Sequence, residues 1–83
     1  MDKKYSKEQI YEKLCEILQQ EFEVDKSMLN EDANLFTDLE LDSIDAVDLA
    51  VRLQQFIEKR ISPEEFKQIR TLKDVVDAVY SLL

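Results

Sequence analysis

Hydrophobic residues recur with helical spacing in the first quarter of the chain. The spacing i, i+4, i+7 and i+8, which places side chains on one face of a helix, is met by Ile10, Leu14, Ile17 and Leu18. Ser6 and Gln9 precede this stripe as the two partners of a capping box, and Tyr5 can pack on Ile10 as a hydrophobic staple. The pattern therefore predicts an amphipathic helix that starts after Ser6 and ends near residues 20 to 22.

A second helix is predicted from Ser43 to about Lys59, and it carries apolar residues on two faces. Its core stripe, at the spacing of one helical face, consists of Ala46, Leu49, Ala50, Leu53, Phe56 and Ile57. Ile44, Val47 and Val51 fall on nearly the opposite face, with polar side chains beside them. Exposed apolar strips rimmed by charge are common partner-binding sites. The alternative is that the first helix or the preceding loop covers this strip.

The rest of the chain predicts two further helices and one long loop. Ser62, Pro63 and Glu65 form a compact helix-start signature, so we expect a short helix that ends before Thr71. Thr71 and Asp74 open the last helix, whose apolar stripe is Leu72, Val75, Val76, Val79, Leu82 and Leu83. Between residues 23 and 42 the periodicity is lost but apolar residues persist, which indicates a loop pinned across the core.

These elements predict an all-α fold: a small four-helix bundle with a long first loop and a short third helix. The 83 residues suffice for one small domain, so residues 1–83 are expected to form a single domain. A transmembrane helix needs about 20 consecutive apolar residues, and no apolar run in this chain approaches that length. The N-terminus does not resemble a signal peptide, so a cytoplasmic location is expected. Cys15 lies next to the first stripe, where a small buried hydrophobe is its expected role.

The negative charge of the chain is concentrated around Ser43. The whole chain carries −8, whereas residues 21–48 carry −9, because Lys26 is accompanied there by Glu21, Glu23, Asp25, Glu31, Asp32, Asp38, Glu40, Asp42, Asp45 and Asp48. Such a field repels nucleic acid and anionic membranes, and it steers basic protein surfaces toward itself. We therefore expect no nucleic-acid binding, no membrane insertion, and protein partners with basic docking patches.

Ser43 stands at the start of the second predicted helix, where serine is a favoured N-cap. Asp38, Glu40 and Asp42 alternate like the ligands of a calcium loop. Ser43 stands where that loop needs glycine and Leu49 where it needs glutamate, so no metal site is expected. The sequence has no glycine and no histidine, which excludes glycine-rich phosphate loops and a serine hydrolase triad. We therefore expect no intrinsic catalysis, and an anion attached to Ser43 would be favoured by the helix dipole.

The stretch LFTDLELDSIDAVDLA, residues 35–50, resembles the acyl carrier protein family, whose hallmark is Asp-Ser-Leu followed by an acid at the start of the second helix. The positions that match the family pattern are Asp38, Leu39, Asp42, Ser43, Asp45, Val47 and Leu49. Ile44 replaces the usual leucine conservatively. The resemblance extends over the whole chain, including the long first loop, the entry to the short third helix and the last helix.

This resemblance implies that Ser43 receives 4'-phosphopantetheine from coenzyme A through a magnesium-dependent phosphopantetheinyl transferase. The thiol at the end of that arm then carries acyl groups as thioesters. The family's exposed apolar positions, which partner enzymes grip, correspond to Ile44, Val47 and Val51. The acidic positions that meet basic residues of partners correspond to Asp42, Asp45 and Asp48. Family members often shelter the acyl chain between helices two and three, a space that Ile61, Phe66 and Ile69 are expected to line, with bulky Phe56 and Phe66 narrowing it.

The sequence also departs from the family pattern in ways that bear on partner choice. Glu40 and Leu41 replace the usual glycine or alanine before the Asp-Ser pair. The second half of the Ser43 helix, often rich in glutamate, carries Arg52, Gln54, Gln55, Lys59 and Arg60 instead. We expect Arg52 and Arg60 to weaken the acidic partner face, so that acidic recognition is limited to the end near Ser43.

The expected function is that of a discrete acyl carrier protein in a dissociated fatty-acid or secondary-metabolite pathway, monomeric and not itself an enzyme. Its expected partners are a phosphopantetheinyl transferase and acyl-transferring, condensing or acyl-loading enzymes. One alternative is a D-alanyl or aminoacyl carrier, which shares the serine and the fold. An alternative of another class is an unmodified helical interaction module in which Ser43 is only a helix cap.

Overall fold

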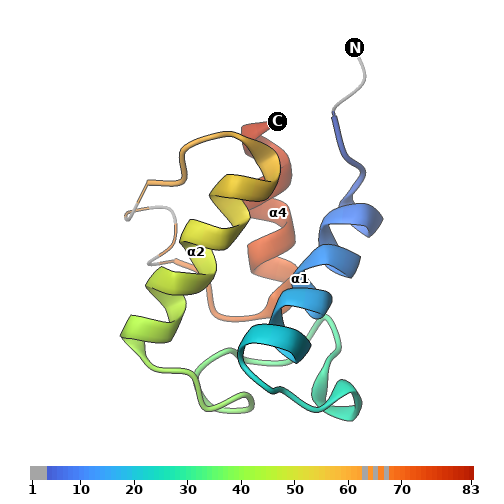
Figure 1. The fold of residues 1–83 in the computed structure, drawn as a ribbon, viewed down its shortest axis with the longest axis vertical. Coiled ribbons are helices and arrows are strands. Elements are labelled where there is room, and N and C mark those ends of the chain that lie inside the picture. Colours follow the sequence, from blue (N-terminus) through green and yellow to red (C-terminus); the bar gives the residue numbers. More distant parts are fainter. Residues whose placement is uncertain (1–3, 63, 65, 67) are drawn as a thin grey trace.

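A computed structural model describes residues 4–62, 64, 66 and 68–83. Within this part of the chain it contains no β-strand, a short 3-10 helix η1 (Lys26–Met28) and three α-helices, α1 (Lys7–Glu21), α2 (Ser43–Ile57) and α4 (Leu72–Leu82). Figure 1 shows α1 and α2 as neighbours, α4 packed behind them, and the loop between α1 and α2 closing one end of the bundle. No helix in the described part of the chain is long and apolar enough to cross a membrane.

Helices α1 and α4 both begin with the capping boxes that the sequence predicts. At α1, the Ser6 hydroxyl accepts from the Gln9 backbone N–H at 3.1 Å, and the Gln9 side chain accepts from the Ser6 N–H at 2.9 Å. At α4, the Thr71 hydroxyl accepts from the Asp74 N–H at 3.2 Å, while the Asp74 carboxylate accepts from the Thr71 N–H at 3.2 Å. The hydrogen bond from the Thr71 backbone N–H to the Asp74 carboxylate also lowers the pKa of Asp74. Each such cap stabilises its helix by about 1 kcal/mol relative to alanine.

The core lies where the apolar stripes of the three helices meet. Its largest fully buried side chains are Ile10, Leu14, Leu18, Leu35, Leu49, Leu53, Ile57, Leu72, Val75 and Val79. Most of these positions belong to the predicted stripes, which confirms the helical periodicity as the signal that places the core. Leu82 and Leu83, at the end of the last stripe, are only partly buried.

The loop between α1 and α2 is tied to the segment before α4. The Leu35 N–H donates to the Arg70 carbonyl at 2.8 Å, and the Leu72 N–H donates to the Ala33 carbonyl at 3.1 Å. Four loop residues bury their side chains in the core, namely Ala33, Leu35, Leu39 and Leu41. The prediction of a loop pinned across the core is therefore confirmed. The burial of Leu41 anchors the end of the loop, and this fixes the position of the next residue, Asp42, at the start of α2.

The predicted short third helix falls partly outside the described residues, because residues 63, 65 and 67 are not among them. Its start signature therefore cannot be compared with the structure at Pro63 and Glu65. The Phe66 N–H donates to the Ser62 carbonyl at 3.2 Å, and the Ile69 N–H to the Phe66 carbonyl at 3.1 Å. The all-helical class is confirmed, whereas the count of four helices is not.

Among the described residues of this glycine-free chain, three glutamates adopt left-handed backbone conformations. They are Glu23, Glu40 and Glu58, with φ angles of 55°, 57° and 57°. Glu58 is the C-cap of α2, so this helix ends at Ile57 and the predicted end near Lys59 is wrong. The physical reason is that a residue in the left-handed conformation turns the chain out of the helix. Glycine usually takes this position, and because the sequence has none, it gave no signal for the end of the helix.

Candidate functional site

Ser43 is the first residue of α2, and its side chain is exposed. The N-cap of this helix is Asp42, whose carboxylate accepts from the Asp45 backbone N–H at 2.8 Å. The Asp45 carboxylate accepts in return from the Asp42 N–H at 3.4 Å. The prediction that Ser43 caps the helix is therefore wrong, because the preceding aspartate holds the capping position and carries a charge that the helix dipole favours. The Ser43 hydroxyl is not needed for the cap.

The second apolar strip of α2 is exposed, as its helical angles predict. Ile44 is 76% exposed, Val47 63% and Val51 42%. The alternative, in which the loop or the first helix covers this strip, is wrong. Asp42 and Asp48 are exposed beside it, so the apolar strip is bordered by negative charge near Ser43.

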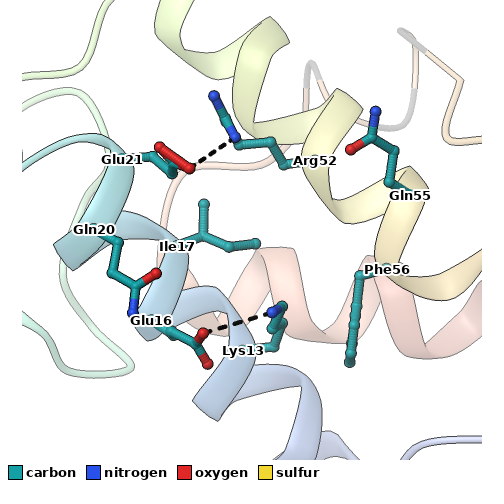
Figure 2. Close-up of a pocket in the computed structure, with 8 residues that line it drawn as sticks. All are labelled: Lys13, Glu16, Ile17, Gln20, Glu21, Arg52, Gln55 and Phe56. Carbon is teal, nitrogen blue, oxygen red and sulfur yellow. Dashed lines mark hydrogen bonds and ion pairs between the residues drawn. The ribbon is translucent and has the colours of Figure 1, made fainter.

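Arg52 faces α1, as Figure 2 shows. Its Nη1 lies 3.0 Å from Oε1 of Glu21 on α1, and its Nε lies 3.5 Å from Oδ2 of Asp48 one turn earlier on α2. The sequence grouped Arg52 with the partner face, but the structure places its guanidinium in a groove between α1 and α2. Arg60 lies beyond the end of α2 and is exposed.

A second groove runs along the other side of α2, with a volume of 460 Å³. The lining contributed by α2 consists of Ser43, Ala46, Val47, Ala50, Val51 and Gln54. Phe36 from the long loop and Ile61, Ser62 and Phe66 from the segment after α2 complete it. The groove is therefore mostly apolar, and Ser43 is one of its lining residues.

Two of the three side chains predicted to line an acyl cavity, Ile61 and Phe66, line this groove. Ile69 does not: it is 2% exposed and belongs to the hydrophobic core. Phe56 does not narrow the groove either, because it lies on the side of α2 that faces α1. There its ring stacks on that of Tyr5, with 4.4 Å between ring centroids, and the Lys13 ammonium lies 5.7 Å from its ring.

The groove residues that the sequence did not predict include Gln54 and Phe36. Gln54 follows Val47 by seven residues and therefore shares its helix face, a signal that was present in the sequence. Phe36 belongs to the loop, where no periodicity indicates which way a side chain lies.

The single cysteine is only half-buried, so the expected buried role is met in part. Burial raises the pKa of the Cys15 thiol, and burial together with a hydrogen bond to this thiol raises the pKa of Tyr11 to about 12. A thiol whose pKa is raised holds little thiolate at neutral pH and is a weak nucleophile. Among the described residues, no group of three or more His, Cys, Asp or Glu side chains is placed to hold a metal ion.

An exposed serine at the start of a helix, next to an apolar groove and a strip bordered by acids, is the arrangement expected of a protein that presents an attached group to partners. Comparison with known proteins agrees with this class. The family described as the phosphopantetheine attachment site matches residues 12–79. The chain therefore belongs to the acyl carrier protein family, and its cofactor is 4'-phosphopantetheine.

Individual proteins that resemble this chain are acyl carrier proteins. Acyl carrier protein 2 of Ralstonia nicotianae is 51% identical over 75 residues, which cover 90% of this chain and 93% of that protein. The acyl carrier protein of Coprothermobacter proteolyticus is 39% identical over 77 residues, covering 93% and 94% of the two chains. The crystal structure of an acyl carrier protein from Thermotoga maritima superposes with a TM-score of 0.80 at 30% identity, covering 92% of this chain and 88% of that one.

The geometry around Ser43 fits this cofactor. The hydroxyl lies on an exposed residue at the first position of a helix of 15 residues, where the dipole favours a phosphodiester. The adjoining groove offers apolar walls to whatever is attached there. When bound, phosphopantetheine supplies a terminal thiol that carries acyl groups as thioesters.

Proposed function

We propose that Ser43 carries the 4'-phosphopantetheine arm and that the chain acts as a discrete, monomeric, single-domain acyl carrier in a dissociated fatty-acid or secondary-metabolite pathway. The observation that carries this proposal is the placement of Ser43. It is exposed, begins α2, lines the apolar groove and is released from capping by Asp42.

The chemistry available at Ser43 makes it an acceptor and not a catalyst. A serine hydroxyl is a weak nucleophile at neutral pH without an adjacent base, and the chain has no histidine. The base is therefore supplied by a phosphopantetheinyl transferase, which takes the hydroxyl proton while Ser43 Oγ forms the new phosphodiester and adenosine 3',5'-bisphosphate leaves coenzyme A. The protein itself is not an enzyme in this proposal.

Partner enzymes dock on the start of α2. Ile44, Val47 and Val51 offer exposed apolar contacts, and Asp42 and Asp45 supply negative charge for basic patches. Asp48 takes part in this surface less freely, because Arg52 lies 3.5 Å from its carboxylate. We place the acidic docking surface at the Ser43 end of the helix for this reason.

The decisive experiment is incubation with coenzyme A, magnesium and a phosphopantetheinyl transferase, followed by intact-protein mass spectrometry. We expect a mass gain of one phosphopantetheine arm in the native chain and none in Ser43→Ala. Ser27→Ala is the matched control, because Ser27 is also exposed, lies outside α2, and should leave the gain intact. A chain that gains no mass with a transferase shown to be active would contradict the proposal and would favour an unmodified helical interaction module.

The cargo class is tested on the modified protein. The modified protein is incubated separately with acyltransferases that use acyl-coenzyme A and with adenylating enzymes that activate amino acids. We expect the acyltransferases to load acyl groups onto the arm and the adenylating enzymes to load nothing. Loading by the amino-acid enzymes alone would instead assign the chain to the D-alanyl or aminoacyl carriers.

A further inference from the structure

The apolar groove beside Ser43 contains an amide side chain, that of Gln54. In the part of the groove that the structure describes, Ser43, Gln54 and Ser62 are the polar residues, and the others are alanine, valine, isoleucine and phenylalanine. Gln54 lies three turns after Ser43 on α2, or about 16 Å along the helix axis at 1.5 Å per residue. It therefore occupies the far part of the groove relative to the attachment point.

The oxygen of the Gln54 side-chain amide is held by a hydrogen bond. This atom, Oε1, accepts a hydrogen bond from the Ile61 backbone N–H at 3.0 Å, which ties the segment after α2 back onto the helix. A glutamine side chain has two N–H donors in addition to this oxygen. Because the oxygen is committed to Ile61, the N–H₂ group is what Gln54 can offer to a molecule in the groove. Ligand pockets use a few such polar groups among apolar walls to set orientation and selectivity.

We propose that Gln54 is a selectivity-determining residue for the cargo: its amide N–H donates to a carbonyl oxygen in an acyl group held in the groove. Acyl groups with an oxo group beyond the thioester are then sheltered in preference to saturated ones. This inference rests on the proposed attachment at Ser43. A saturated chain that covered the amide would leave its donors without acceptors, a state that buried polar groups avoid.

The carbonyl could belong to the acyl group or to the amides of the arm itself, and NMR can separate these sources. The ¹⁵N-labelled protein is prepared with three arms on Ser43: unacylated, hexanoyl and 3-oxohexanoyl. The readouts are the Gln54 side-chain amide resonances, for the hydrogen bond, and the Val47 and Val51 methyl resonances, for occupancy of the groove. Neither readout depends on the activity of a partner enzyme.

We expect the valine methyls to shift with both acyl arms and the Gln54 amide protons to shift downfield only with 3-oxohexanoyl. The ratio of sheltered to exposed arm should be about tenfold higher for 3-oxohexanoyl than for hexanoyl, which corresponds to about 1.4 kcal/mol. An equal Gln54 response to both acyl arms would overturn the proposal, and so would methyls that do not shift. A response complete with the unacylated arm would assign the hydrogen bond to the arm and also overturn the selectivity.

Two variants of equal charge test the role of the donor. Gln54→Glu keeps an oxygen for the Ile61 N–H but loses the N–H donors, so the tenfold preference should disappear while the fold is retained. Gln55→Glu is the control, because Gln55 lines the groove on the α1 side of the helix and should leave the preference unchanged. A preference that survives in Gln54→Glu would overturn the inference.

Failure of this inference is distinguishable from failure of the proposed function. If Ser43 gains no arm, the proposed function itself fails. If the arm is attached and the oxo preference is absent, only the role of Gln54 fails.

Discussion

The two sides of α2 border grooves of opposite character. The groove toward α1, with a volume of 330 Å³, is lined by charged side chains that pair with one another, as the Arg52–Glu21 and Lys13–Glu16 contacts in Figure 2 show. The groove on the other side is larger, at 460 Å³, and is lined largely by small or branched apolar residues. The difference shows how one helix can be fastened on one side and still offer an apolar groove on the other.

The physical cause is the size and chemistry of the side chains that α2 presents to each side. Ala46 and Ala50 are short and leave space beside the helix toward Ile61 and Phe66. Toward α1, Phe56 and Arg52 are long and find partners on the first helix or just before it. The groove toward α1 is therefore poorly suited to an apolar ligand, because charged side chains that pair with one another line it.

The largest effect should come from removing an aromatic ring on either side. Phe56→Ala should lower the free energy of unfolding by about 2 kcal/mol, because the half-buried ring loses its stack on Tyr5. Phe66→Ala should instead widen the apolar groove. Urea denaturation measures the first effect, and methyl shifts of Val47 on acyl loading measure the second. If Phe56→Ala changed those acyl-dependent shifts as much as Phe66→Ala does, the two grooves would not be independent.

The ion pairs of Arg52 should contribute less. Arg52→Gln removes its contacts to Glu21 and Asp48 and should cost about 0.5 to 1 kcal/mol, the range of partly exposed pairs. Arg60→Gln is the control with the same change of charge, and it should leave stability within the error of a denaturation curve. An equal loss in both variants would show that net charge matters here and the pairing does not.

The same two arginines test the docking surface. Arg52→Glu, in the second half of α2, and Arg60→Glu, just beyond that helix, both add negative charge. Both should therefore raise the association rate with a transferase that has a basic patch, most strongly at low salt. Stopped-flow binding measures this rate. Unchanged rates in both variants would contradict the interpretation that these arginines weaken the acidic partner face.

A smaller gain in stability is expected at the turn before α2. Glu40→Gly should stabilise the fold by roughly 0.5 kcal/mol, because relief of a left-handed non-glycine conformation outweighs the extra freedom of the unfolded chain. Glu58→Gly, at the other end of α2, should gain less, since it also removes the ion pair with Lys4. Thermal unfolding of both variants measures the difference, and a loss of stability in Glu40→Gly would show that its carboxylate has a role that the backbone argument misses.

The smallest effect should come from salt. Residues 21–48 carry a net charge of −9, and the pairing of Glu21 and Asp48 with Arg52 relieves only part of it. Added sodium chloride should therefore raise the melting temperature by about 2 °C, or roughly 0.3 to 0.5 kcal/mol for a domain of this size. A flat response would indicate that the charges already compensate one another.

Local features were predictable from the sequence because their partners lie within one helical turn. The capping boxes of α1 and α4 need only residues three positions apart, and both form as predicted. The exposed strip at Ile44 and Val47 follows from helical angles alone, since a helix buried on one face leaves the other to solvent. The Ser43 motif likewise marked the attachment class, although the cap itself proved to be Asp42.

The sequence by itself thus determined the helical class, the helix N-caps at Ser6 and Thr71, the exposed strip and the acidic field around Ser43. Only the tertiary structure decided what each helix face meets across space. In the folded chain, Phe56 and Arg52 face α1, and Ile69 is buried in the core. Phe36 and Gln54 line the groove beside Ser43. The reason is that periodicity assigns a residue to a face of its own helix, whereas its neighbours come from segments whose positions depend on the packing of the whole chain.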